Sequence, residues 1–304
     1  MEASGKLQKG DRVAALTNGR GNARYISIPA SDAILLPPTA THESIICLVA
    51  NYMTAYQSLK LAKMKMGGAP LTNCHVLITG GSAPVGQALI DLASREGAVV
   101  HTTAHQMHQE VSYFAADSVC LYSQLSRARY LIFMLLLLQH LVKNLGVAWY
   151  PVSPRKWLPK LEGQMDIVVD SLCVDGYESS YKALAPGGVL ICTARASETG
   201  KEPQSQNWWS DVKAKFWKNC FTYNIYESFA ADPKLFQQEL LYLCLQLRNG
   251  EINPKVAGRV SLNQVPKAQK LIEKGLPNGT VVLNPWKKLD PKQVSVRIEK
   301  CDHK

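Results

Sequence analysis

The sequence predicts an α/β protein whose main domain is a doubly wound parallel sheet, joined to part of a smaller β-rich module. Three observations predict this fold class. At residues 75–103 an apolar segment, a glycine-rich turn, an amphipathic segment and a second apolar segment follow one another. Apolar segments then alternate with helical patterns as far as residue 250. Residues 1–42 contain short strand-like segments separated by turn residues.

The β-rich part is predicted from "GDRVAAL" (residues 10–16) and "ARYISIP" (residues 23–29), which read as short strands. The turn cluster "TNGRGN" separates them, as in a hairpin. A helix over roughly Glu43 to Ala62 is expected to lead from this part into the parallel sheet.

The parallel sheet is predicted to begin with a βαβ unit: a strand at His75–Thr79, a helix at Pro84–Arg95 and a strand from Ala98 to Thr103. Further strands are expected at residues 147–152, 165–173 (after a charged turn), 188–194 and 220–226, and residues 279–286 are expected to end the fold. Helices are expected at residues 177–185 and 233–250, with Gly250 in the C-cap position of the second.

Composition and charge exclude several classes of protein. The chain has 304 residues, 46% apolar and 19% charged, which is ordinary for a globular protein. The net charge of +10 comes from basic residues scattered along the chain, with a modest cluster at residues 287–304. No zinc-finger spacing, RNA-binding signature or long basic run accompanies this charge, so we expect a small-molecule substrate and no nucleic acid.

The cysteines and the N-terminus indicate a reducing, cytoplasmic location. No C-x-x-C pair and no histidine at ligand spacing occurs around the eight cysteines, which are at positions 47, 74, 120, 173, 192, 220, 244 and 301. This pattern predicts reduced, mostly buried thiols and no metal site. The first residues, "MEASGKLQKGDRVAAL", lack an apolar signal segment and the arginine content of a transit peptide.

The segment "ITGGSAPVGQAL" places glycines between a strand and a helix, as in a Rossmann dinucleotide-binding turn. The three glycine positions of that fingerprint map to Gly81, Ala83 and Gly86, with Ala83 in place of the middle glycine. Pro84 fits the first helical turn, where no amide donor is needed, and the helix N-terminus favours an anion. The predicted cofactor-binding residues here are Gly80, Gly81, Ser82, Ala83, Pro84, Val85 and Gly86. The alternative is a tight packing turn without a nucleotide.

The second strand favours NADP(H) over NAD(H). An Asp or Glu near its end would bind the ribose of NAD, and the stretch from His101 to Gln109 contains neither. Thr103 and His105 are the candidate cofactor contacts in this stretch, although histidines at a helix start are often simply solvated. Asp170 and Ser171 end the fourth strand, at the edge of the sheet where ligands bind, and complete the predicted cofactor site, although Asp170 reads equally well as a residue that orients backbone.

The stretch "NYMTAYQSLKLAKMKMGGAPLTNCHVLITGGSAPVGQALIDLASREGAVV" resembles the zinc-free quinone oxidoreductase and enoyl reductase branch of the medium-chain dehydrogenase/reductase superfamily. "GDRVAAL", "GGVLICTA" and "RVSLNQVPKAQKLIEKGLPNGTVVLNPW" are similar to other segments of that family, in the family's order. The resemblance implies a Rossmann NADP-binding domain over residues 43–254, a remnant of a GroES-like catalytic module at residues 1–42 and 255–287, and a charged tail at 288–304.

The resemblance also implies hydride transfer from NADPH to a quinone or an α,β-unsaturated carbonyl. By family position, Asn51, Thr54 and Tyr56 are the catalytic candidates, although Tyr56 reads equally well as a packing residue. Ala50 occupies the position of a metal-binding cysteine in the zinc enzymes, so no catalytic zinc is expected and hydroxyl or amide donors would stabilise the oxyanion. The alternative function is a non-catalytic nucleotide-binding or scaffold protein with a degenerate Rossmann domain.

The sequence departs from the family pattern at two places, near the N-terminus and after the second strand. The family has a longer segment before "GDRVAAL", so the chain reads as N-terminally truncated, with a substrate pocket that is incomplete and activity that is weak or absent. Val111 to Gln139 reads as an insertion, because joining Glu110 to His140 restores a helix and strand of the expected lengths; the codons at its ends are compatible with a retained in-frame intron.

The apolar run within this insertion, Tyr130 to Leu138, is too short to cross a bilayer, which takes roughly 17 to 25 residues. No membrane association is therefore expected, and attachment through residues 130–138 is the weaker alternative. The family commonly dimerises through the last strand of the sheet, which predicts a homodimer that pairs near residues 220–226.

Overall fold

The computed structural model describes residues 7–17, 19, 21–36, 42–104, 147–193, 217–274, 277 and 279–286. The predicted insertion and the apolar run inside it lie outside these residues. The chain divides into two compact units, which are described one at a time. Ser58–Ser82 and Leu89–Thr222 form the sheet unit, and Met1–Gln57, Ala83–Ala88 and Tyr223–Lys304 form the terminal unit.

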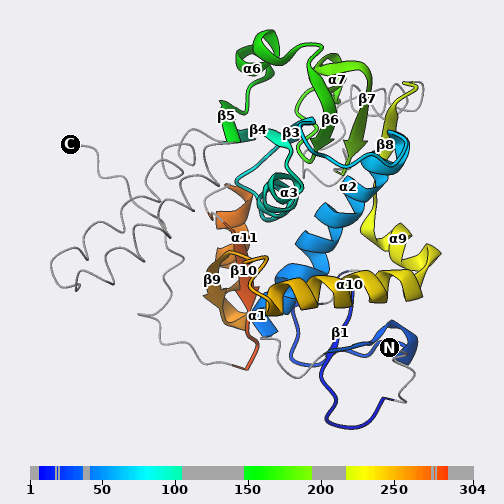
Figure 1. Ribbon diagram of the computed structural model, residues 1–304. Helices are drawn as coiled ribbons and strands as arrows, with labels where there is room; N and C mark the ends of the chain where they lie inside the picture. The colour runs from blue at the N-terminus through cyan, green and yellow to red at the C-terminus, as the bar shows by residue number, and fades with distance from the viewer. Residues whose placement is uncertain are drawn as a thin grey trace, which may run out of the picture. The chain divides into compact units, whose positions relative to one another are not determined.

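The sheet unit contains a six-stranded sheet in the order β5-β4-β3-β6-β7-β8, in which every paired strand is parallel (Figure 1). Its strands are β3 (His75–Thr79), β4 (Val99–Ala104), β5 (Val147–Pro151), β6 (Met165–Asp170), β7 (Leu184–Cys192) and β8 (Cys220–Thr222). This order is that of the doubly wound Rossmann fold, with the reversal of strand order between β3 and β6. The predicted fold class is confirmed for this sheet.

The two central strands are apolar because both faces of the sheet are covered. Val76, Leu77 and Ile78 of β3 are fully buried, and so are the residues that follow Asp166 on β6 as far as Val169. Val76 pairs with Ile167 and Ile78 with Val169, so the two strands end side by side at Thr79 and Asp170. The helices assigned to this part of the chain are α2 (Met53–Lys65), α3 (Pro84–Arg95), α6 (Pro154–Leu161) and α7 (Glu178–Lys182), of which α2 and α3 each begin in the terminal unit.

Two sequence expectations for the sheet unit are wrong. The charged turn before residue 165 contains helix α6, because Pro154 follows Ser153 at the first helical position and Trp157 and Leu161 bury one face of the helix. The strand expected at residues 220–226 ends at Thr222, and a helix begins three residues later, at Ile225, where the Asn224 side chain accepts from two backbone amides.

The terminal unit contains two small sheets and several helices. The strands β1 (Val13–Ala14) and β2 (Ile34–Leu35) are antiparallel, and β9 (Val256–Val260) and β10 (Thr280–Leu283) are parallel. The helices are α1 (His42–Cys47), α9 (Ile225–Ala231), α10 (Pro233–Arg248) and α11 (Val265–Glu273), with a π-helical turn η2 (Leu48–Tyr52) and the 3₁₀ turns η1 (Ala30–Asp32) and η5 (Leu262–Gln264). Gly250 follows α10 with φ of 69°, as a C-terminal glycine should.

The strand expected at residues 23–29 is wrong, because β1 pairs instead with β2. Tyr25 is 81% exposed and Ile26 is 45% exposed, so this segment does not bury an apolar face. The Tyr25 ring instead meets the edge of Trp286, with the ring centroids 5.0 Å apart. The predicted boundaries of the GroES-like remnant, at residues 42 and 255, stay predictions.

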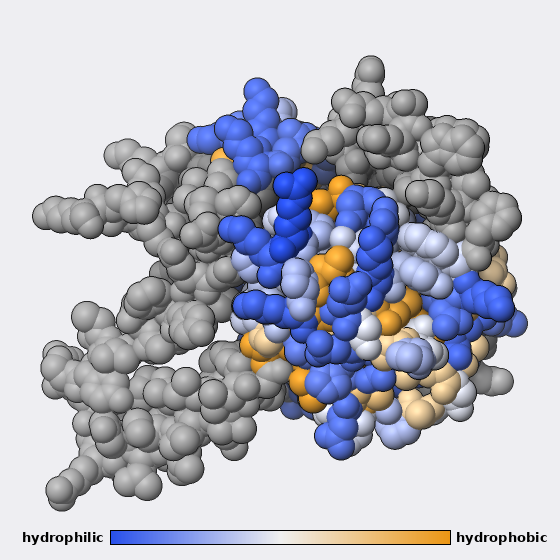
Figure 2. All heavy atoms as spheres, turned by 90° about the horizontal axis from the view of Figure 1, so that it is seen from above, coloured by the Kyte–Doolittle hydropathy of each residue, from blue (hydrophilic) through white to orange (hydrophobic). Residues whose placement is uncertain are grey.

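The described residues form a mostly hydrophilic surface, as the composition of a globular protein predicts. In the view from above, hydrophilic side chains cover most of the coloured surface, and hydrophobic ones form small groups between them (Figure 2). Among the described helices, none combines the length and the hydropathy needed to cross a bilayer. The edge position of β8 is compatible with the predicted homodimer, which stays a prediction.

Candidate functional site

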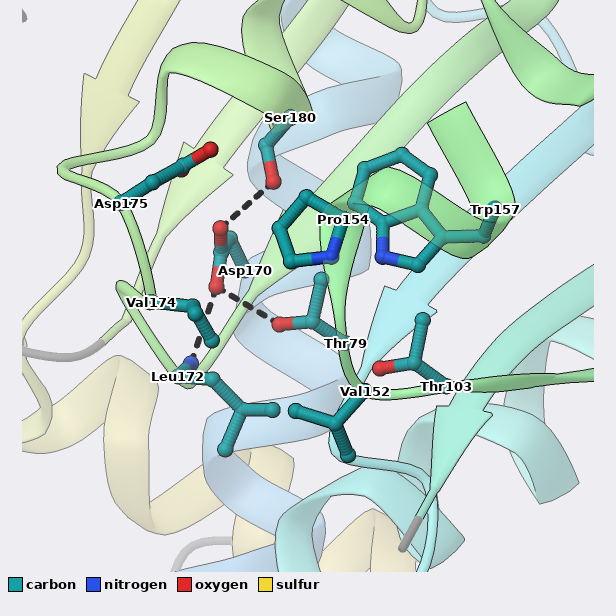
Figure 3. Close-up of a pocket in the computed structure, with 10 residues that line it drawn as sticks. All are labelled: Thr79, Thr103, Val152, Pro154, Trp157, Asp170, Leu172, Val174, Asp175 and Ser180. Atoms are coloured by element: carbon teal, nitrogen blue, oxygen red, sulfur yellow. Dashed lines mark hydrogen bonds between the residues drawn. The ribbon is translucent and has the colours of Figure 1, made fainter. Parts of the chain in front are cut away.

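A pocket lies at the carboxyl ends of β3, β4 and β6, where the strand order of the sheet reverses (Figure 3). Its volume is about 220 Å³, including the space open to solvent. It is lined by Thr79, Thr103, Val152, Pro154, Trp157, Asp170, Leu172, Val174, Asp175 and Ser180, all of which belong to the sheet unit. In open α/β sheets, this crevice is where ligands bind.

The turn after β3 depends on two adjacent glycines. Gly80 has φ of 77°, a left-handed conformation that side chains disfavour, and a Cβ there would approach Leu172 to 3.1 Å. A Cβ on Gly81 would lie 2.0 Å from the Thr102 hydroxyl oxygen, so no larger residue fits. The fingerprint predicted that Gly81 makes the tight turn. In the structure Gly80 has the left-handed backbone instead, and Gly81 is the glycine that lies close to Thr102.

Hydrogen bonds to β4 hold this turn in place. The Gly80 amide donates to the Thr103 hydroxyl at 3.1 Å, and the Gly81 amide donates to the Thr103 carbonyl at 2.8 Å. The Thr102 hydroxyl donates to the carbonyl of Ile78 at 2.8 Å. Thr103, predicted as a cofactor contact, therefore lies at the pocket and organises the glycine turn.

Asp170 organises the turn after β6. It is only 3% exposed, and its carboxylate accepts from the hydroxyls of Thr79 at 2.6 Å and Ser180 at 2.5 Å (Figure 3). It also accepts from the backbone amides of Leu172 at 2.9 Å and Cys173 at 3.0 Å. Because these donors converge on one carboxylate, its evident role is to fix the shape of the pocket; direct contact with a cofactor stays a prediction.

Ser171 lies in the same bonded group. Its amide donates to the Thr79 hydroxyl oxygen at 3.0 Å, and its own hydroxyl accepts from Thr193 at 2.9 Å. The structure therefore brings five predicted cofactor residues to one edge of the sheet: Gly80, Gly81, Thr103, Asp170 and Ser171. Ser82 and Ala83 lead into the first turn of α3, which holds Pro84, Val85 and Gly86. His105 lies outside the described residues.

The catalytic candidates lie in the terminal unit, on η2 and the start of α2. The Asn51 side-chain amide donates to the Thr280 hydroxyl at 2.9 Å, and the Thr54 hydroxyl donates to the Ala50 carbonyl at 2.7 Å. The Tyr56 ring is tilted against Tyr242, with a centroid separation of 5.8 Å. The π-helical turn that carries Asn51 was not predicted, and such turns are frequent at functional sites.

A buried polar network, also missed by the sequence analysis, lies beside Thr54. The Gln57 side chain donates to Glu239 at 2.6 Å and accepts from the Tyr223 hydroxyl at 2.5 Å and from Ser228 at 2.9 Å. Burial and the nearby Glu239 raise the pKa of Tyr223, although hydrogen bonds from Ser228 and Thr54 oppose that shift. Tyr223 therefore stays protonated at neutral pH. The network links a catalytic candidate to a phenol that no sequence motif marks.

Trp157 is one of several pocket residues that sequence reasoning missed. It is 2% exposed, and its indole Nε1 is buried with no hydrogen-bond partner within the part of the chain that the structure describes. A signal was available, because the Ser153-Pro154 pair is typical of a helix start. The four-residue spacing of Trp157 and Leu161 then indicates a buried helix face.

Two cysteines of the sheet unit lie against each other on neighbouring strands. The Cys192 and Cys220 sulfurs are 3.5 Å apart on neighbouring strands, and both are free thiols. The Cys220 contact and burial raise the pKa of Cys192, and burial raises the pKa of the neighbouring Tyr177. Both groups are therefore neutral at ordinary pH. Among the described residues, no three His, Cys, Asp or Glu side chains gather closely enough to bind a metal ion.

Comparison with known sequences finds one matching family model and similar segments in much longer proteins. Residues 152–283 match the family model described as zinc-binding dehydrogenase. The chain is 38% identical over 102 residues to lovastatin diketide synthase mokB of Monascus pilosus, and 24% identical over 284 residues to highly reducing polyketide synthase ZEA2 of Gibberella zeae. These matches cover 33% and 91% of this chain, but only 4% and 10% of those proteins' lengths.

Solved structures share the fold at low sequence identity. The JamJ enoyl reductase has a TM-score of 0.59 and 19% identity, over 84% of this chain and 66% of that one. The human synaptic vesicle membrane protein VAT-1 homolog-like protein has a TM-score of 0.63 and 18% identity, over 95% and 76%. A quinone oxidoreductase of Pseudomonas syringae has a TM-score of 0.61 and 18% identity, over 92% and 76%.

Proposed function

From the resemblance to the medium-chain dehydrogenase/reductase superfamily, which the family-model match over residues 152–283 and the shared fold support, we propose that this chain is an NADPH-dependent, zinc-free oxidoreductase. The proposed reaction transfers hydride to a quinone or to an α,β-unsaturated carbonyl. The names of two similar structures, an enoyl reductase and a quinone oxidoreductase, support this substrate class.

The observation that carries the proposal is the paired-glycine turn at the point where the strand order reverses. Gly80 and Gly81 place backbone without side chains directly after Thr79, which lines the pocket, and both amides donate to Thr103. A turn of this kind lets a pyrophosphate approach the backbone, and the following helix start favours its negative charge. The residues present therefore fit a dinucleotide, with Gly80, Gly81, Ser82 and Thr103 nearest the phosphates and ribose.

NADP(H) is the proposed form of the cofactor because the described end of β4, "HTTA", carries no carboxylate. An acidic side chain there would bind the free ribose of NAD and repel a 2′-phosphate. When bound, the reduced cofactor supplies the hydride. Thr103 and Gly80 then orient the nucleotide, and Asp170 holds the two turns that border it.

The other chemical task is to stabilise negative charge on the substrate oxygen without a metal ion. Asn51 and Thr54 carry suitable donors, a side-chain amide and a hydroxyl, although in this structure each donates within the protein, to Thr280 and to the Ala50 carbonyl. We propose that one of these two side chains turns toward the substrate oxygen. Tyr223 lies near Thr54, and its raised pKa keeps its phenol protonated.

NADPH fluorescence tests the proposal directly. Titration of the full chain should change the emission of NADPH, and NADH should bind at least about tenfold more weakly if the 2′-phosphate is favoured, a difference of about 1.4 kcal/mol. Absence of a change with either nucleotide would overturn the assignment. Turnover of a small enone or quinone then separates the reductase from the non-catalytic nucleotide-binding alternative.

A further inference from the structure

Two free thiols on β7 and β8 are in contact, and the proposed reaction uses neither of them. The Sγ atoms of Cys192 and Cys220 are 3.5 Å apart. Cys220 pairs in register with Leu190, and Cys192 pairs with Thr222, so the cysteines are diagonal neighbours on one face of adjacent parallel strands (Figure 1). Their side chains lean toward each other along the strands. This contact places each sulfur within reach of the other if one of them becomes oxidised.

The two thiols differ in exposure and in acidity. Cys192 is 2% exposed, whereas Cys220 is only partly buried, so a small oxidant meets Cys220 first. The hydrogen bond from Cys192 lowers the pKa of Cys220, although burial and the negative charge of Asp170 oppose that shift. Burial raises the pKa of three other thiols, those of Cys47, Cys74 and Cys244. Because the thiolate is the reactive form of cysteine, Cys220 is the more reactive member of the pair.

We propose that Cys192 and Cys220 form a dithiol that hydrogen peroxide oxidises to a reversible disulfide. The inference goes beyond the proposed function and does not depend on it. No cofactor or substrate of the proposed reductase takes part in this oxidation.

The oxidation has two steps. The Cys220 thiolate attacks one oxygen of the peroxide, the O–O bond breaks, and the sulfur becomes a sulfenic acid; the other oxygen leaves as hydroxide and takes up the proton that Cys220 released. The Cys192 sulfur then attacks the sulfenic sulfur, so that the S–S bond forms and the S–O bond breaks; the departing hydroxide takes the Cys192 proton. The two thiols together lose two electrons and two protons, and one peroxide becomes two waters.

The register of the strands favours a disulfide that is easily reduced. A disulfide needs sulfurs about 2.05 Å apart and Cα atoms within about 7 Å, and diagonal neighbours lie farther apart than directly paired residues. The bond therefore requires β8 to move toward the end of β7. Strand β8 has three residues and, among the described strands, pairs only with β7, so this shift disturbs few hydrogen bonds. Disulfides closed under strain are readily reduced, which makes the bond reversible.

The alternative is that the two thiols only pack together. An S–H···S hydrogen bond and burial against the core cluster of the sheet unit account for their contact without any oxidation. The two explanations differ in what peroxide does to the folded protein. Packing alone predicts that folding protects both sulfurs, whereas the dithiol predicts that folding speeds their joining.

Peptide mass spectrometry of the full chain tests this difference. After brief treatment with equimolar hydrogen peroxide, free thiols are blocked with N-ethylmaleimide and the protein is digested without reduction. Trypsin places Cys192 in the peptide of residues 183–195 and Cys220 in that of residues 219–234, each with a single cysteine. We expect these peptides to be joined, and dithiothreitol to separate them. In concentrated urea the link should form at least about tenfold more slowly, because the thiols are no longer held in contact.

Serine variants separate the roles of the two cysteines. Cys220→Ser should abolish the link and leave Cys192 reduced, because the buried thiol does not react first. Cys192→Ser keeps a hydrogen-bond donor but cannot close the bond, so Cys220 should stop at the sulfenic acid, which dimedone traps. Cys244→Ser, which removes a buried thiol of α10, is the control and should form the link as the wild type does.

Three results with the wild-type protein would overturn the dithiol: absence of the linked peptides, equal rates of linking with and without urea, or a link from either cysteine to Cys173 instead. These measurements need no variant, so they hold even if a serine substitution prevents folding. They also need no NADPH, so the proposed function stands or fails separately.

Discussion

The turn after β3 (residues 80–82) and the turn after β6 (residues 171–174) follow strand ends that lie side by side at one edge of the sheet, where Thr79, Leu172 and Val174 line the pocket. The first turn is shaped by the absence of side chains at Gly80 and Gly81, and backbone amides attach it to β4. The second is shaped by one side chain, because backbone and hydroxyl donors converge on the buried carboxylate of Asp170.

The two turns therefore differ in role. A ligand can approach the glycine turn after β3, whereas the turn after β6 supports the glycine turn. A glycine turn leaves its outer surface open to a phosphate. A carboxylate that already accepts several hydrogen bonds has little capacity left for a ligand, and its negative charge would oppose a phosphate. Thr79 joins the two turns, since its hydroxyl donates to Asp170 and accepts from the Ser171 amide.

Removal of the Asp170 carboxylate should have the largest effect. Asp170→Ala leaves several buried donors without an acceptor, and each such donor costs about 1–3 kcal/mol, so we expect a loss of at least about 3 kcal/mol in the free energy of unfolding. Urea denaturation measures it. Asp166→Ala is the control on the same strand, where a half-buried carboxylate accepts from the His75 amide; it should cost under about 1 kcal/mol. Equal losses in the two variants would contradict the role given to Asp170.

Substitution of Gly81 should have the next largest effect. The added Cβ of Gly81→Ala would overlap the Thr102 hydroxyl, and overpacking of this kind costs about 1–3 kcal/mol. Gly163→Ala is the control for left-handed backbone alone, with φ of 68° and open space around its Cβ, and should cost about 1 kcal/mol. In a Thr102→Ala background the cost of Gly81→Ala should fall, as a double-mutant cycle would measure; an unchanged cost would mean that the overlap is not the cause.

The smallest effect is expected where the two turns are joined. Thr79→Val keeps the shape of the side chain but removes the hydroxyl that links Asp170 and Ser171, so we expect a loss of about 1–2 kcal/mol in urea denaturation. Thr79→Ser retains the hydroxyl and should recover most of this stability. If the serine variant is as unstable as the valine variant, the methyl group matters and the link between the turns does not.

The sequence predicted the regular part of the site well, because its signals are local. The strand His75–Thr79 and the helix Pro84–Arg95 have the predicted bounds, since an apolar strand, a glycine turn and a proline at a helix start are each encoded by neighbouring residues. Gly80, Thr103 and Asp170 could be placed at one edge because parallel strands end together. Strand β1 has only two residues, and its partner Ile34–Leu35 could not be read from its own pattern.

The amino-acid sequence by itself determined the α/β class, the glycine turn and the set of strand ends that form the candidate cofactor site, because alternating local patterns encode each of them. Tertiary structure alone decided how the side chains at those ends are used. The Asp170 carboxylate gained the Ser180 hydroxyl as a donor only once α7 had packed against β6, and the buried Trp157 indole on α6, beside β5, has no hydrogen-bond partner among the described residues. Whether a buried polar group finds a hydrogen-bond partner depends on which residues far apart in the sequence come together. The spacing of residues along the chain does not show this.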